Sequence, residues 1–459
     1  MSLLTTLQAA RRGLQVSSEG INIVGHNTAN ATNENYARRT QSIATMHPLH
    51  RNGQWLGQGA RTEFFRRHVD VMLEQQLVHT HGKHSRSKQA YESTRMLEAR
   101  LADGSAGSIL DSYNSFMGSL RQMRDDPSDI VFRDQVLLEA ERFTESVRTT
   151  TDFFVDNITN VRNSIEGSID DINDKIRSIA EFNKRIRHYG TTMAANDLMD
   201  QRDAVVKELS QLVGVHVHHR DDGQSTIYVH NHAVVQEGNF RLLSYSEDGN
   251  KKPMISISGD SANIDVSDGL EGVLKGKLDA YDVASGFVND MNTFVDAFAT
   301  QFNSIHSSGN ALGQSSSSGI DFFEFNALSP ATSFRVNANV LDDVTLLSAA
   351  LTDEVGDSDN LTQLIELDNT DSLISTSYSP TQFLSKIFAD VGSAVNKASR
   401  DYEIQDLRLN DMNELRNSIS GVDLDSEAAR LIEYQASYEA ASKVISVTNQ
   451  MLQELMNIV

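Results

Sequence analysis

The hydrophobic residues at the two ends of the chain follow the heptad pattern of a coiled coil, in which apolar positions alternate at spacings of four and three. Near the N-terminus the pattern comprises Leu3, Leu7, Ala10, Leu14, Ser17, Ile21, Val24 and Thr28. Near the C-terminus it comprises Tyr434, Tyr438, Ala441, Ile445, Thr448, Leu452, Leu455 and Val459. We therefore predict a helix over residues 1–30 and another over 424–459, paired with each other as a coiled coil.

The two terminal helices differ in how well they are expected to form alone. Gly13, Gly20 and Gly25 lie inside the first, and each costs about 1 kcal/mol of helix propensity relative to alanine. The second helix carries a further apolar stripe beside its heptad positions, made of Ala440, Val444, Val447, Met451 and Ile458. A helix that is apolar over most of its circumference must be covered by another surface.

Between the ends, helical periodicity dominates. It predicts helices over residues 67–102, 107–125, 130–188, 195–213, 272–306 and 381–418. Residues 31–65 are rich in Asn, Thr and Gly and are expected to be irregular or extended. Residues 320–379 have the weakest periodicity, and we expect a small outer domain there.

Residues 214–262 change to the period of a β-strand. The alternating apolar positions are Val215, Val217, Ile227, Val229, Ile255 and Ile257. Asp221, Asp222 and Gly223 supply the turn of a hairpin, so the segment predicts one small antiparallel sheet. The chain as a whole is predicted to be mainly α with a smaller β part.

Composition removes several kinds of chemistry. The 459 residues include no cysteine, which excludes disulfides, thiolate zinc sites and cysteine nucleophiles. The net charge of −23 and the scattered placement of the arginine pairs argue against nucleic-acid binding. The first residues lack the basic and apolar segments of a secretory signal, so we do not expect the general secretory route.

No catalytic motif is found, and four histidines form the strongest candidate metal site. His216 and His218 are expected on one strand face, with His230 and His232 on the facing strand. They are equally explained as polar positions on the solvated face of the hairpin, and no carboxylates can be placed behind them. We therefore predict no enzyme, no catalytic, cofactor-binding or metal-binding residues, and no cofactor, and keep a metal-dependent surface enzyme as the alternative from another class.

Two motifs near the chain ends resemble those of bacterial flagellar axial proteins. The first is the run Asn27-Thr-Ala-Asn30-Ala-Thr-Asn-Glu-Asn-Tyr36-Ala-Arg38. Asn35 stands where most relatives have Gly, and an Asn tolerates the positive φ of such a turn. The second comprises Ser420 and Gly421, Leu424, and Gln435 within the terminal helix.

The interior distinguishes among these axial proteins. The run Asn196-Asp-Leu-Met-Asp-Gln-Arg-Asp203, the segment from Leu209 to Val215 and the hairpin resemble the FlgK family of hook-associated proteins. Rod and hook subunits share the terminal motifs but differ here. A distal rod or hook subunit is therefore the alternative within the same class.

The resemblance implies an elongated, multidomain structural subunit at the junction between hook and filament. It implies a terminal assembly domain (1–30 plus 424–459), a helical rod-like domain (31–310 plus 380–423, with the hairpin subregion 214–262) and a small outer domain (311–379). It also implies export by the flagellar type III apparatus to an extracellular location. The implied partners are other copies in a ring, the hook protein, a second junction protein and an export chaperone at the C-terminal helix, with no membrane or nucleic acid.

Overall fold

The computed structural model describes residues 3–51, 54–102, 108–190, 193–220, 222–249, 251–259, 262–314, 316–352, 354, 356–370, 374 and 378–458. Val459, the last residue of the predicted heptad pattern, and Asp221, in the predicted turn, lie outside this range, as does the side chain of Ile458.

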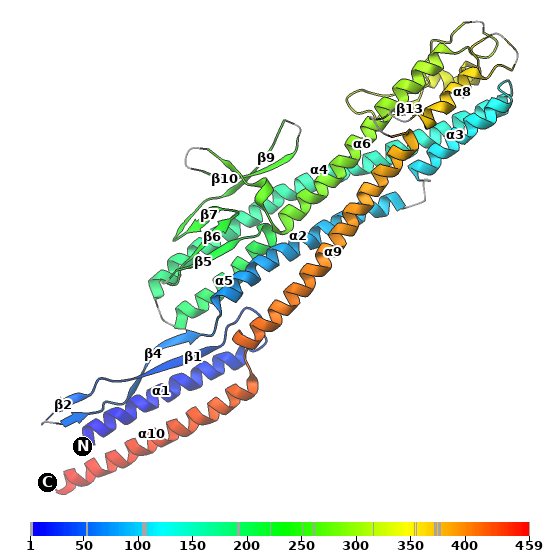
Figure 1. The fold of residues 1–459 in the computed structure, drawn as a ribbon. Coiled ribbons are helices and arrows are strands. Elements are labelled where there is room, and N and C mark those ends of the chain that lie inside the picture. Colours follow the sequence, from blue (N-terminus) through cyan, green and yellow to red (C-terminus); the bar gives the residue numbers. More distant parts are fainter. Residues whose placement is uncertain are drawn as a thin grey trace. The chain divides into compact units, whose positions relative to one another are not determined.

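Helices form most of the structure (Figure 1). They are α1 (Leu3–Ala29), α2 (Val71–Ala102), α3 (Ile109–Asp125), α4 (Ile130–Tyr189), α5 (Met193–Val213), α6 (Gly272–Ser308), α7 (Ala338–Asp342), α8 (Asp359–Glu366), α9 (Pro380–Ser420) and α10 (Leu424–Ile458). Every predicted helix is confirmed to within a few residues. None of the helices in the described part of the chain combines the length and apolarity that a membrane crossing requires.

The chain divides into two compact units. Unit 1 contains residues 1–85, 168–272 and 404–459, and unit 2 contains residues 86–167 and 273–403. The boundary falls inside α2, α4 and α9, so these helices contribute residues to both units. The three-domain division expected from the sequence follows different boundaries and stays a prediction.

Unit 2 is built on an aromatic core. Rings from α3, α4 and α6 meet rings from the segment after α6, which pairs β12 (Phe323–Glu324) with β13 (Arg335–Val336). Phe298 on α6 is fully buried, and its ring centroid lies 5.5 to 6.2 Å from those of Phe294, Phe143 and three others. Phe322, Phe323 and residues of α8 belong to the same core, so the weakly periodic segment shares its core with the long helices.

Unit 1 contains two small sheets next to the second half of α4. One has the order β5 (His216–His219), β6 (Ser225–Val229), β7 (His232–Gln236), β8 (Asn239–Phe240), and the other has β11 (Ile264–Asp265), β10 (Pro253–Ile257), β9 (Leu243–Glu247). All neighbours are antiparallel. The prediction of one sheet was wrong. The strand after β8, β9, pairs with β10 and not with β8, so Ile255 and Ile257 of β10 belong to a second sheet.

Two asparagines of α4 bind backbone groups of these sheets. Asn183 donates to Ser225 O (2.8 Å) and accepts from Ser225 N (3.1 Å). Asn173 makes the same pair with Leu243, at 2.9 Å in both directions. A side-chain amide matches a backbone amide in donors and acceptors, so each asparagine satisfies strand groups that would otherwise be buried without partners.

A two-stranded ribbon connects α1 to α2. Its long strands are β1 (Arg39–Thr45) and β4 (Ala60–Arg67), paired antiparallel with a register shift between Ser42 and Ile43, and its end carries β2 (Leu49–Arg51) and β3 (Gln54–Leu56). The expectation of an irregular or extended segment is therefore refined to a ribbon. An isolated two-stranded ribbon is marginally stable in water, so its contacts with neighbouring elements decide its position.

Phe298→Ala should lower the free energy of unfolding by about 3–5 kcal/mol, because it leaves a cavity among five aromatic rings that cannot collapse. Urea unfolding followed by circular dichroism would measure the change. The control is Leu328→Ala, since Leu328 is 92% exposed and its removal should cost no more than about 0.5 kcal/mol. Equal effects of the two substitutions would contradict the assignment of the core.

Candidate assembly site at the chain ends

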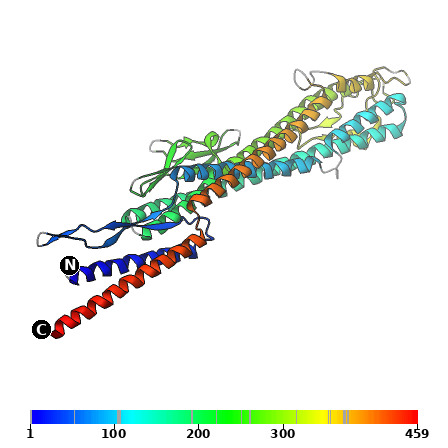
Figure 2. The same cartoon turned by 60° about the horizontal axis from the view of Figure 1, so that its bottom comes forward.

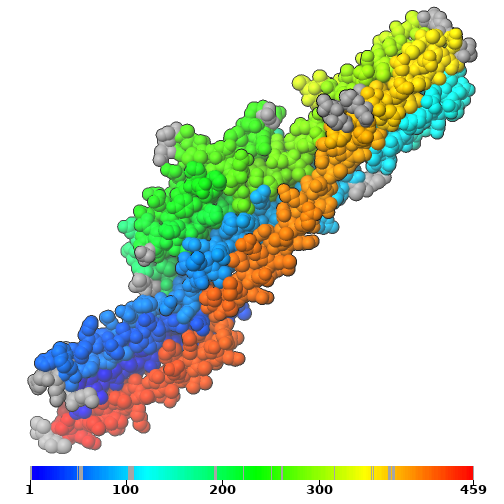
Figure 3. Space-filling view, in the orientation of Figure 1, coloured from blue at the N-terminus to red at the C-terminus, as the bar shows by residue number. Residues whose placement is uncertain are grey.

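The two terminal helices lie side by side in both views of the ribbon (Figures 1 and 2). They run antiparallel, with the start of α1 beside the end of α10. In the space-filling view α10 lies on the surface along its length (Figure 3). The predicted pairing of the two chain ends is therefore confirmed, although they are more than 400 residues apart.

Glycines bring the helices into close contact. A Cβ added to Gly20 would lie 2.7 Å from the ring of Tyr434, and one added to Gly13 would lie 3.8 Å from the Cβ of Ala441. One heptad further along α1, Asn27 bonds Glu427 of α10. These three pairs share one antiparallel register. Glycines that cost helix propensity in α1 thus let Tyr434 lie against its backbone.

Most of the predicted assembly residues are half-buried in the single chain. This group comprises Leu3, Leu7, Leu14, Ile21, Tyr434, Ile445 and Leu452. Val24 is buried, whereas Tyr438 and Leu455 are 38% and 52% exposed. The heptad pattern did not predict the burial of Val16 and Ile23. Both are buried because the ribbon covers a second face of α1.

Asn27 lies at the point where α1, the ribbon and α10 meet. Its Nδ2 donates to Arg39 O and to Glu427 Oε2, both at 2.9 Å. Its Oδ1 accepts from Tyr36 OH (2.8 Å) and Arg39 N (3.0 Å). Burial raises the pKa of Tyr36 to about 12, so the phenol keeps the proton it donates. The amide is fully buried and all four of its hydrogen-bonding positions are used.

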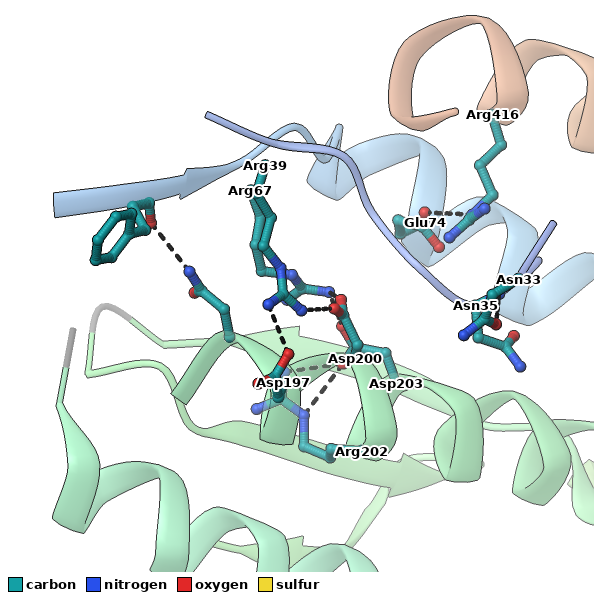
Figure 4. Close-up of polar contacts among 12 residues, drawn as sticks. Asn33, Asn35, Arg39, Arg67, Glu74, Asp197, Asp200, Arg202, Asp203 and Arg416 are labelled. Atoms are coloured by element: carbon teal, nitrogen blue, oxygen red, sulfur yellow. Dashed lines mark hydrogen bonds and ion pairs between the residues drawn. The ribbon is translucent and has the colours of Figure 1, made fainter. Parts of the chain in front are cut away.

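The rest of the N-terminal motif forms the turn after α1. Asn30 donates from its side chain to His26 O (2.9 Å), and Arg38 N donates to Ser420 O (2.9 Å). Asn35 does not have positive φ, so the expectation that it replaces a left-handed glycine was wrong. Instead, Asn35 N donates to Asn33 Oδ1 (3.1 Å), and this side-chain turn fixes the backbone (Figure 4).

The C-terminal motif connects α9 to α10. A Cβ on Gly421 would lie 2.3 Å from Asn417 O, so the close turn admits only glycine. Asp423 accepts from the backbone N–H of Asp425 (3.0 Å), which is the capping arrangement at the start of α10. Leu424 and Gln435 of the motif are exposed and contribute no buried contact in the single chain.

The interior motif on α5 binds the ribbon through ion pairs (Figure 4). Arg39 of β1 pairs with Asp197 at 2.5 Å and also with Asp200. Arg67, its cross-strand partner on β4, pairs with Asp200 at 2.6 Å and with Asp203 at 2.9 Å. The carboxylates are three residues apart and therefore share one face of α5, opposite the two guanidinium groups.

Burial and charge act in opposite directions on these carboxyl groups. Burial alone would raise the pKa of Asp203, but the charges of Arg202 and Arg67 outweigh it and lower the pKa to about 2. Burial raises the pKa of Asp200, although Arg67 and Arg39 oppose the change. Arg39 is 1% exposed, so its charge depends on these partners for compensation.

The α5 motif was predicted from the sequence only as a family signature, and Arg39, Arg67 and Glu427 were not predicted as site residues. The side chains of Arg39 and Asp197 are separated by 158 positions, so no local spacing connects them. The signal that was available is the spacing of Asp197, Asp200 and Asp203, which repeats every three residues and places carboxylates along one helix.

The histidines do not form the predicted facing pairs. His216 and His218 do share an exposed strand face, opposite Tyr228 and Thr226 of β6. His230 lies in the turn after β6 with φ 54°, and His232 begins β7, so neither faces β5. Among the described residues, no three His, Asp or Glu side chains are placed to hold a metal ion.

Arg39→Met should lower the free energy of unfolding by about 3–5 kcal/mol, because Asp200 loses a partner in a buried position. Chemical denaturation would measure the loss, and hydrogen exchange should show faster opening of β1 and β4. The matched control is Arg66→Met, because Arg66 is exposed on the same ribbon. A loss of equal size in the control would show that general charge, rather than this contact, stabilises the ribbon.

Asp203→Asn should destabilise the protein at neutral pH but not at low pH. The folded pKa of about 2 lies below the ordinary 3.8, so the ionised group contributes stability above 3.8 that is lost as the pH falls toward 2. Urea midpoints of both proteins should differ by a constant amount at neutral pH and converge in this window. A difference that persists unchanged in acid would contradict the ion-pair account.

The sequence is similar to those of known flagellar proteins. The model described as the flagellar hook-associated protein FlgK helical domain matches residues 94–323, and the C-terminal model of flagellar basal body rod FlgEFG proteins matches residues 416–458. Flagellar hook-associated protein 1 of Escherichia coli (strain K12) is 22% identical and that of Bacillus subtilis (strain 168) is 23% identical. The alignments cover 98% of this chain in both cases, and 98% and 97% of the relatives.

A solved structure shows the same fold. The flagellar hook junction protein FlgK from Burkholderia pseudomallei matches 75% of this chain and 100% of its own, with a TM-score of 0.63 at 13% sequence identity. The helical-domain match spans half of the sequence and includes the part of the unit 2 core that α3, α4 and α6 supply. The chain is therefore a member of the FlgK family of flagellar hook-associated proteins.

Proposed function

We propose that this chain is a structural subunit of the junction between hook and filament, and that copies assemble into a ring through the outer face of α10. The observation that carries the proposal is the apolar stripe on α10 that α1 does not cover. Val444, Val447 and Met451 are 42%, 39% and 48% exposed. They follow helical spacing with Ala440 and lie on a different side of the helix from the pairing residues.

An exposed stripe of this kind favours association with a further surface. Each large apolar side chain gains about 1.5–3 kcal/mol when it is fully buried. The face opposite the stripe carries Ser442, Ser446, Asn449 and Gln453. Because only one of the two faces is apolar, association is expected through that face and not through the whole surface of the helix.

The role we propose is mechanical and not catalytic. The names of the relatives, hook-associated protein and hook junction protein, support a position at the end of the hook. In our proposal the ring at this position adapts the flexible hook to the stiffer filament. The alternative of a distal rod or hook subunit rests on the C-terminal match, which covers residues 416–458 alone. The interior match is to the hook-associated family, which favours the junction.

Export and partners complete the proposal. The chain is exported unfolded by the flagellar type III apparatus, with a chaperone on the C-terminal helix, and assembles outside the cell on the hook protein and beneath the second junction protein. A chain without cysteine has no disulfide that unfolding for export would break. A helix whose apolar faces have no partner during export also needs a temporary cover.

Val447→Asp tests the outer face of α10 apart from folding. The purified variant should melt as the wild type does, because Val447 is already exposed in the single chain. Cells carrying it should build hooks but lack filaments and release flagellin into the medium, since a buried carboxylate without a partner opposes assembly. Electron microscopy and immunoblots of the medium would measure both results.

The matched control is Ser446→Asp, which adds the same charge to the neighbouring exposed position on the polar face. These cells should carry full filaments and swim. If Val447→Asp cells also swim with full filaments, the outer face of α10 is not the assembly surface. If only the variant's melting temperature falls, the residue serves the fold of the subunit instead.

A further inference from the structure

A cavity of about 340 Å³ lies within unit 1, between α2, α5 and strand β5. Figure 4 shows part of its polar boundary, with Glu74 and Arg416 on one side and Arg202 and Asp203 on the other. The volume is in the range of sites that bind small organic molecules. The cavity is separate from the paired helices α1 and α10, so it is not explained by the proposed assembly surface.

One wall of the cavity is apolar. It is formed by Val69, Leu77, Val78, Met199, Val206 and Val217. These side chains come from α2, α5, β5 and the segment before α2, and they surround a space that a ligand with a hydrocarbon body can fill. A purely polar ion would leave this wall in contact with water.

The charged residues around the cavity carry a positive excess. Five cationic side chains line it (Arg67, Arg202, Lys207, Arg220 and Arg416), against three anionic ones (Glu34, Glu74 and Asp203). This excess occurs in a chain whose net charge is −23. A concave, partly apolar site of the opposite sign to the whole protein selects for anions over cations.

Most of these cations already make ion pairs, whereas the charges of Glu34 and Glu74 act on Lys207 only from a distance. Arg416 pairs with Glu74 at 2.8 Å, and Arg202 pairs with Asp203 at 2.9 Å. Within the described part of the chain, Lys207 makes no hydrogen bond or ion pair, although it is half-buried. An ammonium group removed from water without a partner is costly, so a ligand that supplies an anion would offset the cost.

His81 adds a second unused polar group at the cavity. It is 5% exposed, and its Nε2 has no hydrogen-bond partner among the described residues. Burial, followed by the nearby charge of Lys207, lowers its pKa to about 3, so the imidazole is neutral at physiological pH. A buried ring nitrogen without a partner is expected to be satisfied by a bound molecule or an ordered water.

We propose that this cavity binds a small organic carboxylate, whose oxygens pair with Lys207 and whose hydrocarbon body packs on the apolar wall. A single unpaired ammonium fits a carboxylate better than a phosphate, which favours several free guanidinium or backbone N–H donors. An acidic side chain from a second copy would fill only part of the cavity. The proposal is independent of the hook-filament function.

Octanoate is the probe for this site, titrated into the full-length chain by calorimetry. Wild type should bind it saturably with one site per chain, and 1-octanol, which lacks the charge, should bind more weakly. Lys207→Met should weaken octanoate binding about tenfold or more, because a charge-assisted contact is lost. Lys88→Met, at an exposed lysine outside the cavity, should bind as wild type does.

A measurement on unmodified protein covers the case in which Lys207→Met fails to fold. Octanoate should slow acetylation of Lys207 in wild type, measured by mass spectrometry, while acetylation of Lys88 stays constant. Absence of saturable binding, equal binding by the Lys207→Met variant, or equal protection of both lysines would overturn the proposal. So would a change in self-association of Lys207→Met with no octanoate binding by wild type, which would indicate an acidic segment of a second copy as the occupant.

Discussion

The amide of Asn27 is buried completely, and it uses both donors and both acceptor positions on Tyr36, Arg39 and Glu427. A buried polar group that loses its partner costs about 1–3 kcal/mol, so the end of α1, the start of the ribbon and the start of α10 must all be in contact with Asn27 in the folded chain. This shared contact fixes the antiparallel register of α1 and α10. In that register Gly20 and Gly13 of α1 lie against Tyr434 and Ala441 of α10.

The ribbon depends on a different interaction, the ion pairs between its arginines and the carboxylates of α5. Arg39 therefore belongs to two networks, since its backbone bonds Asn27 while its side chain pairs with Asp197 and Asp200. Replacing such pairs with apolar groups often leaves stability unchanged, whereas removing one partner is costly. We therefore expect these ion pairs to fix the orientation of the ribbon on α5. Together with Asn27, they hold the N-terminal, C-terminal and α5 motifs in fixed positions relative to one another within unit 1.

The sequence predicted the helices well because their periodic apolar faces are a local property, and the scarcity of proline permits the lengths of α4 and α9. The pairing of Arg39 with Asp197 could not be predicted, since it depends on where two distant elements meet. The glycines of α1 were interpreted only as a cost, because propensity does not reveal that a tyrosine lies opposite. His230 was misplaced because β6 ends at Val229, so His230 lies in the turn that leads to β7, and β7 pairs with β6 and not with β5.

The incomplete covering of α10 follows from the same pairing. With three glycines, α1 alone would be a marginally stable helix. Its contacts with α10 at Asn27 and Gly20 stabilise both helices before any second surface is present. The remaining stripe of Val444, Val447 and Met451 is then already helical. Association of an ordered face loses less conformational entropy than association of a disordered segment. In the proposed ring, the internal pairing of the chain ends is thus the step that prepares each copy for the next.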